Sequence, residues 1–172
     1  MLNLLPELES KDAVLYSYVG KALFAAQRVE FLSKIVEGHL LEFDSIYKIT
    51  SESFQKNAIY KSENIFRCLG QIFRYLKLNP NLIPDHLFDT YIENRNYLVH
   101  EFSIELLRNQ SQENLRKATL FCIEFSRHSD FITKYFKGLL FYLILRQFGK
   151  ENMDPAIQSW TKDYQFFIDR LK

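Results

Sequence analysis

The chain contains 172 residues with a mass of 20.6 kDa, a length that suits one domain and excludes two large ones. Its 22 Lys and Arg residues are balanced by 21 Asp and Glu residues, so the net charge of +1 provides no general basic field for nucleic acid and no acidic tail. Hydrophobic residues make up 47% of the chain and glycine plus proline only about 5%, which favours a compact helical protein over disorder or a turn-rich β-fold.

Targeting signals and paired cysteines are both missing from the sequence. The first seven residues have no basic n-region, and the longest apolar run, 139–145, is far shorter than a membrane span. Cys68 and Cys122 form no C-x-x-C pair, so we expect two small buried residues rather than a disulfide framework or a zinc site. We therefore expect a cytoplasmic protein without a membrane partner.

The first predicted helix is defined by apolar or small residues that recur every three or four positions from Leu15 to Val36. Ser10 is its predicted N-cap, and Gly38 stands where a C-cap is usual. Residues 39–50 show no period and are predicted to form a connection. A second helix is predicted from Thr50 or Ser51 to just before Asn79-Pro80-Asn81, because proline cannot continue it.

Three further helices follow. One opens at Pro84-Asp85 and is predicted to carry Phe88, Tyr91, Ile92, Val99 and Phe102 on one side. The next begins after Ser111 and keeps its apolar period to Leu143; the polar run 127–130 either breaks it or lies on its exposed side. Asp154-Pro155 predicts the start of a last helix that runs towards Leu171. Residues 1–172 are thus predicted to form a single all-α domain, a bundle of about five helices.

The third predicted helix, which opens at Pro84-Asp85, is unusual because Arg95 lies in the middle of its predicted apolar face. Arginine is rarely buried without a partner, since removing its charge from water costs several kcal/mol. Arg95 must therefore meet a buried carboxylate, extend to solvent, or face a cleft where its charge is used. Asn96 and His100 are four residues apart at the edge of the same face.

The sequence Arg95-Asn96, three residues, then His100 resembles the motif of the HEPN superfamily, and a short all-α domain suits that family. The resemblance covers six residues closely and the architecture loosely. It implies catalytic roles for Arg95, Asn96 and His100 in a metal-independent endoribonuclease of toxin–antitoxin or phage-defence type. It also implies a homodimer in which two motifs meet, an RNA substrate and an antitoxin protein as a further partner; no cofactor or metal is expected.

The residue types suit RNA cleavage by the substrate's own 2′-hydroxyl. Histidine acts as base or acid near neutral pH, and arginine presents a cationic fork that matches phosphate oxygens. Asparagine either orients the histidine or hydrogen-bonds the phosphate. Because one His100 supplies half of an acid–base pair, a dimer that joins two of them is chemically sensible. The expected products are a 2′,3′-cyclic phosphate and a 5′-hydroxyl, formed without metal.

Two other classes of protein remain open. In a non-catalytic HEPN-like adaptor, Arg95 would only pair with Glu63, Glu124 or another acidic side chain; a nucleotide-binding regulator would bind without turnover. His39, His86 and His128 are scattered without metal-ligand spacing and receive no assigned role. Residues 95–150 hold nine Lys and Arg against five Asp and Glu, a local excess of +4 that coincides with the motif.

Overall fold

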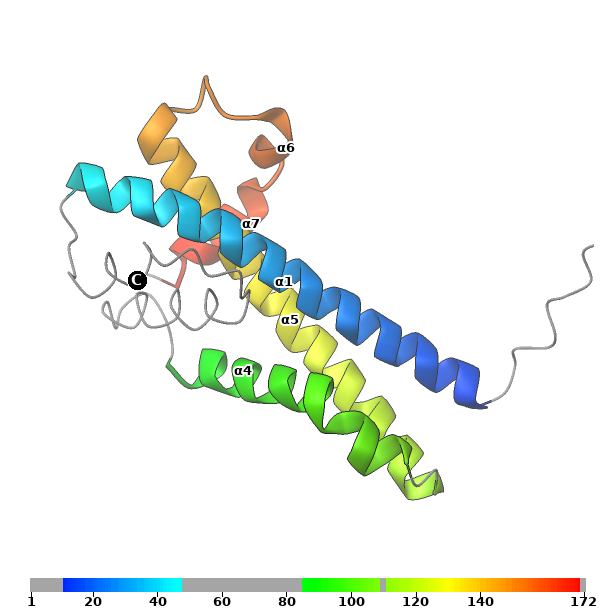
Figure 1. Ribbon diagram of the computed structural model, residues 1–172. Coiled ribbons are helices and arrows are strands. Elements are labelled where there is room, and N and C mark those ends of the chain that lie inside the picture. Colours follow the sequence, from blue (N-terminus) through cyan, green and yellow to red (C-terminus); the bar gives the residue numbers. More distant parts are fainter. Residues whose placement is uncertain (1–10, 48–84, 109–110, 171–172) are drawn as a thin grey trace, which may run out of the picture.

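The computed structural model describes residues 11–47, 85–108 and 111–170, and every regular element in these ranges is a helix (Figure 1). The all-α prediction is confirmed for this part of the chain, whereas the helix predicted between Thr50 and Asn79 lies outside it. The elements in chain order are α1 (Lys11–Tyr47), α4 (Asp85–His100), the π-helix η1 (Ser103–Leu107), α5 (Gln112–Phe148), α6 (Pro155–Gln158) and α7 (Thr161–Ile168).

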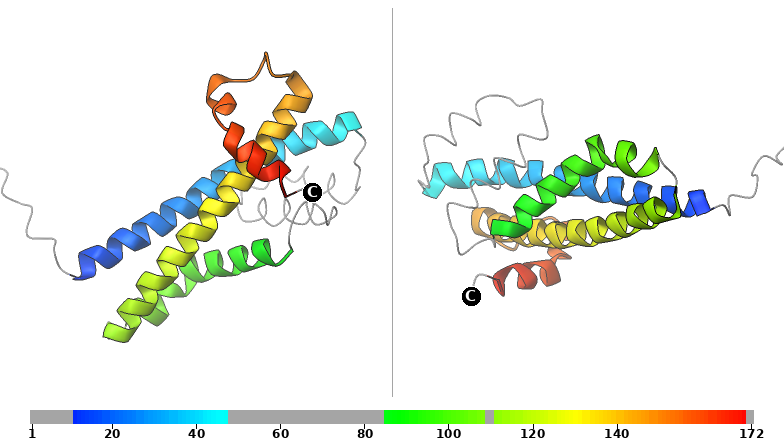
Figure 2. Two further views of the ribbon diagram at one scale, coloured as in Figure 1. Left: turned by 180° about the vertical axis from the view of Figure 1, so that it is seen from behind. Right: turned by 90° about the horizontal axis from the view of Figure 1, so that it is seen from below.

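Two long helices organise the described part of the molecule. Helices α1 and α5 each contain 37 residues and run side by side in the same direction. Helix α4 returns along them in the opposite direction, and α7 packs on the C-terminal half of α5 (Figure 2). The motif helix α4 is therefore held against the α1–α5 pair.

The buried side of α1 is the one that its sequence period predicts. Leu15, Ala22, Val29, Leu32 and Val36 are all buried. The small residues among them let α5 approach closely, which is how a seam of this kind packs.

The C-cap predicted at Gly38 is wrong, because α1 continues through it to Tyr47. Gly38 keeps a negative φ, and a glycine inside a helix costs only about 1 kcal/mol relative to alanine. The next residue is tied to α5: His39 Nδ1 lies 2.9 Å from Gln147 Oε1, and the Gln147 amide donates back to the His39 carbonyl at 3.3 Å. These contacts tie α1 to α5 one residue beyond the predicted end of the helix.

Helix α5 begins as predicted after Ser111. The hydroxyl oxygen of Ser111 caps the helix by accepting a hydrogen bond from the backbone N–H of Asn114 at 3.2 Å. The polar run 127–130 does not break it. Arg127 and Asp130 are exposed, whereas Ser129 is buried and donates to the Phe125 carbonyl of its own helix at 2.8 Å. The run therefore contains both exposed and buried positions within one continuous helix.

The last predicted helix is two helices. Asp154 caps α6 by accepting from the Ala156 amide at 2.7 Å, as the Asp-Pro pair predicts. The chain then turns at Ser159 and Trp160 before α7. This turn seats α7 on α5, where Phe167 is fully buried and its ring centroid lies 5.2 Å from that of Tyr135.

Aromatic rings fill the space between α4 and α5. Tyr91 stacks on Phe125 with ring centroids 5.4 Å apart, and Phe88 meets Tyr135 edge to face at 5.6 Å. Such pairs add about 0.5–1.5 kcal/mol each to the burial of their surface. Cys122 is buried beside them as expected, and this burial raises the pKa of its thiol to about 11.

Candidate functional site

Helix α4 has a buried side, flanked by half-buried residues, and an exposed side. Its buried residues, together with Phe102 just beyond the helix, are Phe88, Tyr91, Arg95 and Leu98. Val99 was predicted on this side but is 44% exposed, so the apolar face is narrower than its pattern suggests. The exposed side carries two of the three motif residues, Asn96 and His100.

Arg95 meets a buried carboxylate. Its side chain is 6% exposed, and its Nε and Nη2 atoms both donate to Glu30 Oε1 of α1, at 2.9 and 2.8 Å. Glu124 is exposed on α5, and Glu63 lies outside the described residues. Two donors on one oxygen form a charge-assisted pair that fixes the plane of the guanidinium and ties α4 to α1.

The pair also orients Asn96. The remaining guanidinium nitrogen, Arg95 Nη1, donates to Asn96 Oδ1 at 3.2 Å. With its oxygen turned towards Arg95, the amide directs its two N–H donors away from the ion pair. Glu30, Arg95 and Asn96 thus form a chain of hydrogen bonds that runs from the interior to the exposed side of α4.

His100 is exposed one helical turn after Asn96. The chain turns directly afterwards into the π-helix η1, in which Ile104 is 60% exposed. Asp89 and Glu93 precede the motif on the exposed side of α4, and the basic excess of residues 95–150 comes mainly from α5. His100 therefore stands at the C-terminal end of α4, between Asn96 and the exposed Ile104 along the chain.

Buried polar groups also lie between α4 and α5. The rings of Tyr91 and His128 meet edge to face with centroids 5.6 Å apart, and His128 Nε2 is buried with no hydrogen-bond partner among the described residues. Burial lowers the pKa of His128 because it disfavours the imidazolium, and a hydrogen bond to the Leu87 backbone offsets part of this effect. His128, left unassigned by its sequence context, is thus a residue of the α4–α5 contact.

Glu30 is the residue of this candidate site that the sequence pattern does not reveal. It belongs to α1, 65 positions before Arg95, and it directly follows the buried Val29 at the edge of the seam. The only signal in the sequence was Arg95 itself. Its place on an apolar face indicates a carboxylate partner but does not identify which acidic residue that partner is. The partner becomes identifiable only when α1 and α4 are packed together.

Within residues 11–47, 85–108 and 111–170, no three His, Cys, Asp or Glu side chains are grouped so that they could hold a metal ion. In the same ranges no helix has both the length and the apolar character needed to cross a bilayer. Comparisons with protein-family models, with curated proteins and with solved structures find no match to this chain.

Proposed function

We propose that this chain is an HEPN-like, metal-independent endoribonuclease of the toxin or phage-defence kind. The observation that carries the proposal is the chain of hydrogen bonds from Glu30 through Arg95 to Asn96, which presents amide donors one turn from the exposed His100. Donors fixed beside an imidazole are suited to hold a phosphate oxygen while the imidazole moves a proton. In this arrangement Arg95 is a positioning residue for Asn96.

The proposed reaction is attack of an RNA 2′-oxygen on the adjacent phosphorus. One His100 takes the proton from the 2′-hydroxyl as the new P–O bond forms, and His100 of the partner subunit protonates the 5′-oxygen as the old bond breaks. The products are a 2′,3′-cyclic phosphate and a 5′-hydroxyl. Both histidines return to their starting states after the proton is passed between them by solvent.

The test is cleavage of a purified RNA in the presence of EDTA, with end-group analysis of the fragments. We expect His100→Ala to abolish cleavage, because it removes both the base and the acid of the dimer. Asn96→Ala should lower kcat by roughly 10²–10³-fold, the usual cost of removing one donor to a developing charge. Glu93→Gln, on the same exposed side of α4, is the matched control and should cleave at least as fast as the wild type.

Fragments with 5′-phosphate ends, or cleavage that requires added metal, would contradict this mechanism. A substrate with one 2′-deoxynucleotide on the 5′ side of the scissile phosphate should resist cutting at that position, because it lacks the attacking oxygen. Far-UV circular dichroism of each variant separates loss of chemistry from loss of fold.

A second candidate is a non-catalytic HEPN-like adaptor, and the occupied fork of Arg95 favours it. Both Nε and Nη2 are directed to Glu30 and not to solvent, which is the geometry of a structural ion pair. Expression in bacterial cells distinguishes the two candidates. Growth arrest that His100→Ala relieves supports the ribonuclease, whereas identical growth with both proteins supports the adaptor.

A further inference from the structure

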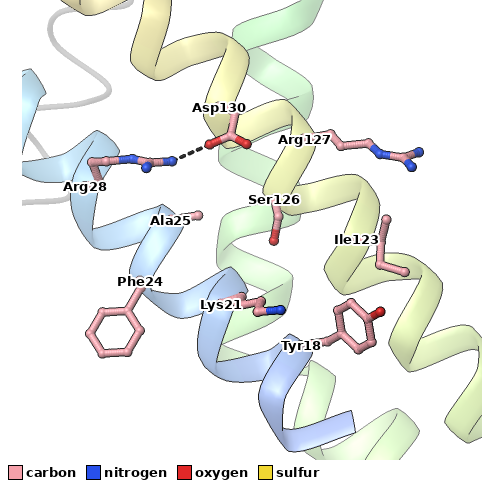
Figure 3. A pocket seen from close by; sticks show the side chains of 9 residues that line it. All are labelled: Tyr18, Lys21, Phe24, Ala25, Arg28, Ile123, Ser126, Arg127 and Asp130. Carbon is pink, nitrogen blue, oxygen red and sulfur yellow. Dashed lines mark hydrogen bonds and ion pairs between the residues drawn. The ribbon is translucent and has the colours of Figure 1, made fainter. Parts of the chain in front are cut away.

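A groove of about 570 Å³ runs between α1 and α5, and α4 passes behind these helices when the groove is viewed from its open side (Figure 3). Small side chains, Ala25 and Ser126, line its centre. The side chains of Phe24 and Arg127 stand on opposite rims, one on each helix. The groove is therefore open to solvent and separate from the exposed side of α4.

The charges of this groove are unbalanced. Lys21, Arg28 and Arg127 line it together with one carboxylate, that of Asp130. Arg28 and Asp130 form an ion pair that joins the helices, with both side chains about half exposed. Lys21 and Arg127 form no salt bridge to any described residue, so two positive charges remain for a ligand.

Aromatic surface lies beside these charges. Phe24 is 74% exposed, an unusual position for so large an apolar ring. The Tyr18 ring lies deeper, and the Lys21 ammonium is 5.4 Å from its centroid. An exposed ring next to cations that have no carboxylate partner among the described residues suits a ligand that combines a flat aromatic group with negative charge.

The same seam continues towards the N-terminal ends of both helices. A second depression of about 360 Å³ is lined by Leu15 of α1 and by Leu115 and Arg116 of α5. Arg116 adds a third cation that forms no salt bridge within the part of the chain that the structure describes. From Leu15 to Arg28 the seam covers 13 helical steps, or about 20 Å. This length accommodates several linked phosphates rather than one.

We propose that this groove binds a segment of single-stranded RNA. Lys21, Arg116 and Arg127 contact phosphates, and Phe24 stacks on a base, the combination by which single strands are held without sequence preference. The choice of RNA rests on the proposed function, since the groove itself selects only for linked phosphates and aromatic bases. The groove would contact the strand at a distance from the phosphate that is cleaved. This second contact would increase the time that the substrate stays bound.

The test is fluorescence anisotropy of a labelled 12-nucleotide uridine oligomer, titrated with protein that carries His100→Ala so that the strand stays intact. Arg127→Glu should weaken binding by roughly tenfold and reduce the slope of log K against log salt by about 0.7, the value for one phosphate contact on a single strand. Phe24→Ala should weaken binding by about fivefold or more, the loss of one base stack.

Each variant has a matched control. Lys150→Glu makes the same change of net charge beyond the end of α5, and Phe31→Ala removes a ring that is 64% exposed on α1 but does not line the groove. Both controls should bind the oligomer with the same affinity as the protein that carries His100→Ala alone. The proposal is overturned if a control loses as much affinity as its groove variant, or if the oligomer does not bind at 50 mM salt.

The outcomes for the two proposals are distinguishable. If the wild-type protein does not cleave but binds RNA through the groove, the ribonuclease assignment fails and the groove stands. If His100→Ala abolishes cleavage while Arg127→Glu and Phe24→Ala leave affinity unchanged, the ribonuclease stands and the groove assignment fails.

Discussion

Arg95 and Glu30 show how one residue in the sequence can demand a partner that the sequence does not identify. The guanidinium occupies a position where a leucine would normally pack, and it is tolerated because a carboxylate that is only 13% exposed meets it. A pair of this kind contributes little net stability compared with apolar packing, but breaking it leaves a buried charge without compensation. Its main effect is to fix how α4 sits on α1.

Replacing Glu30 by glutamine should therefore destabilise the protein by about 3–5 kcal/mol, because Arg95 would stay buried without its counter-charge. Urea unfolding followed by circular dichroism measures the change. Joint replacement Glu30→Leu with Arg95→Met should recover most of the loss, since both charges are then gone.

Glu113→Gln is the control for this experiment. Glu113 pairs with Lys117 at 3.5 Å on the surface of α5, with both side chains more than half exposed, and its removal should cost no more than about 0.5 kcal/mol. Equal effects of Glu30→Gln and Glu113→Gln would mean that the ion pair does not hold α4 in place.

At the scale of single helices, capped beginnings could be predicted from the sequence, whereas the end of α1 and the start of α7 could not. Ser111 and the Asp154-Pro155 pair mark helix starts correctly, because a cap is formed by residues two or three positions apart. Gly38 fails as an end because a glycine is tolerated inside a helix, and the next residue, His39, contacts Gln147 of α5, which lies 108 residues later in the chain. The polar run 127–130 stayed ambiguous because burial of Ser129 depends on packing against other helices.

Replacing either of two helical glycines by alanine should change the free energy of unfolding, in opposite directions for Gly38 and Gly138. An added Cβ at Gly38 would meet nothing within 4 Å, so Gly38→Ala should raise the free energy of unfolding by up to about 1 kcal/mol. At Gly138 it would lie 2.3 Å from the Asp163 carbonyl oxygen and 2.4 Å from Phe167 Cβ, so Gly138→Ala must displace α7 and should cost at least about 1–3 kcal/mol.

Thermal unfolding of the two variants measures both effects. The wild-type chain is the reference, and Gly20→Ala, also in α1 with nothing within 4 Å of an added Cβ, is a second stabilising control. A destabilising Gly38→Ala would show that α1 does not continue through this position.

For the molecule as a whole, the sequence indicated the class of fold but not its surfaces. Helical period and low glycine and proline content are properties of single segments, and they were sufficient to predict an all-α chain. The groove between α1 and α5 combines Lys21 of one helix with Arg127 of another, and no local pattern relates them. The exposure of Asn96 and His100 likewise follows from which side of α4 the other helices cover.

The proposed ribonuclease requires a dimer, so light scattering at micromolar concentration should give about twice 20.6 kDa. Val99 and Ile104 are exposed apolar side chains close in sequence to His100, and we expect them in the interface. Ile104→Asp should then shift the mass towards the monomer, whereas Leu120→Asp on α5 should not. A monomeric wild-type protein would exclude a site shared by two chains.

The pairing of α1 with α5 has a consequence for synthesis of the chain. Arg28 and Asp130, which join these helices, are separated by 102 residues. Translation proceeds at about 5–20 residues per second, so about 5 to 20 seconds pass between the emergence of one and that of the other. During this interval the alanine, valine and leucine seam of α1 has no α5 to cover it. Until α5 has been made, the seam of α1 is therefore either exposed on the nascent chain or covered by a chaperone.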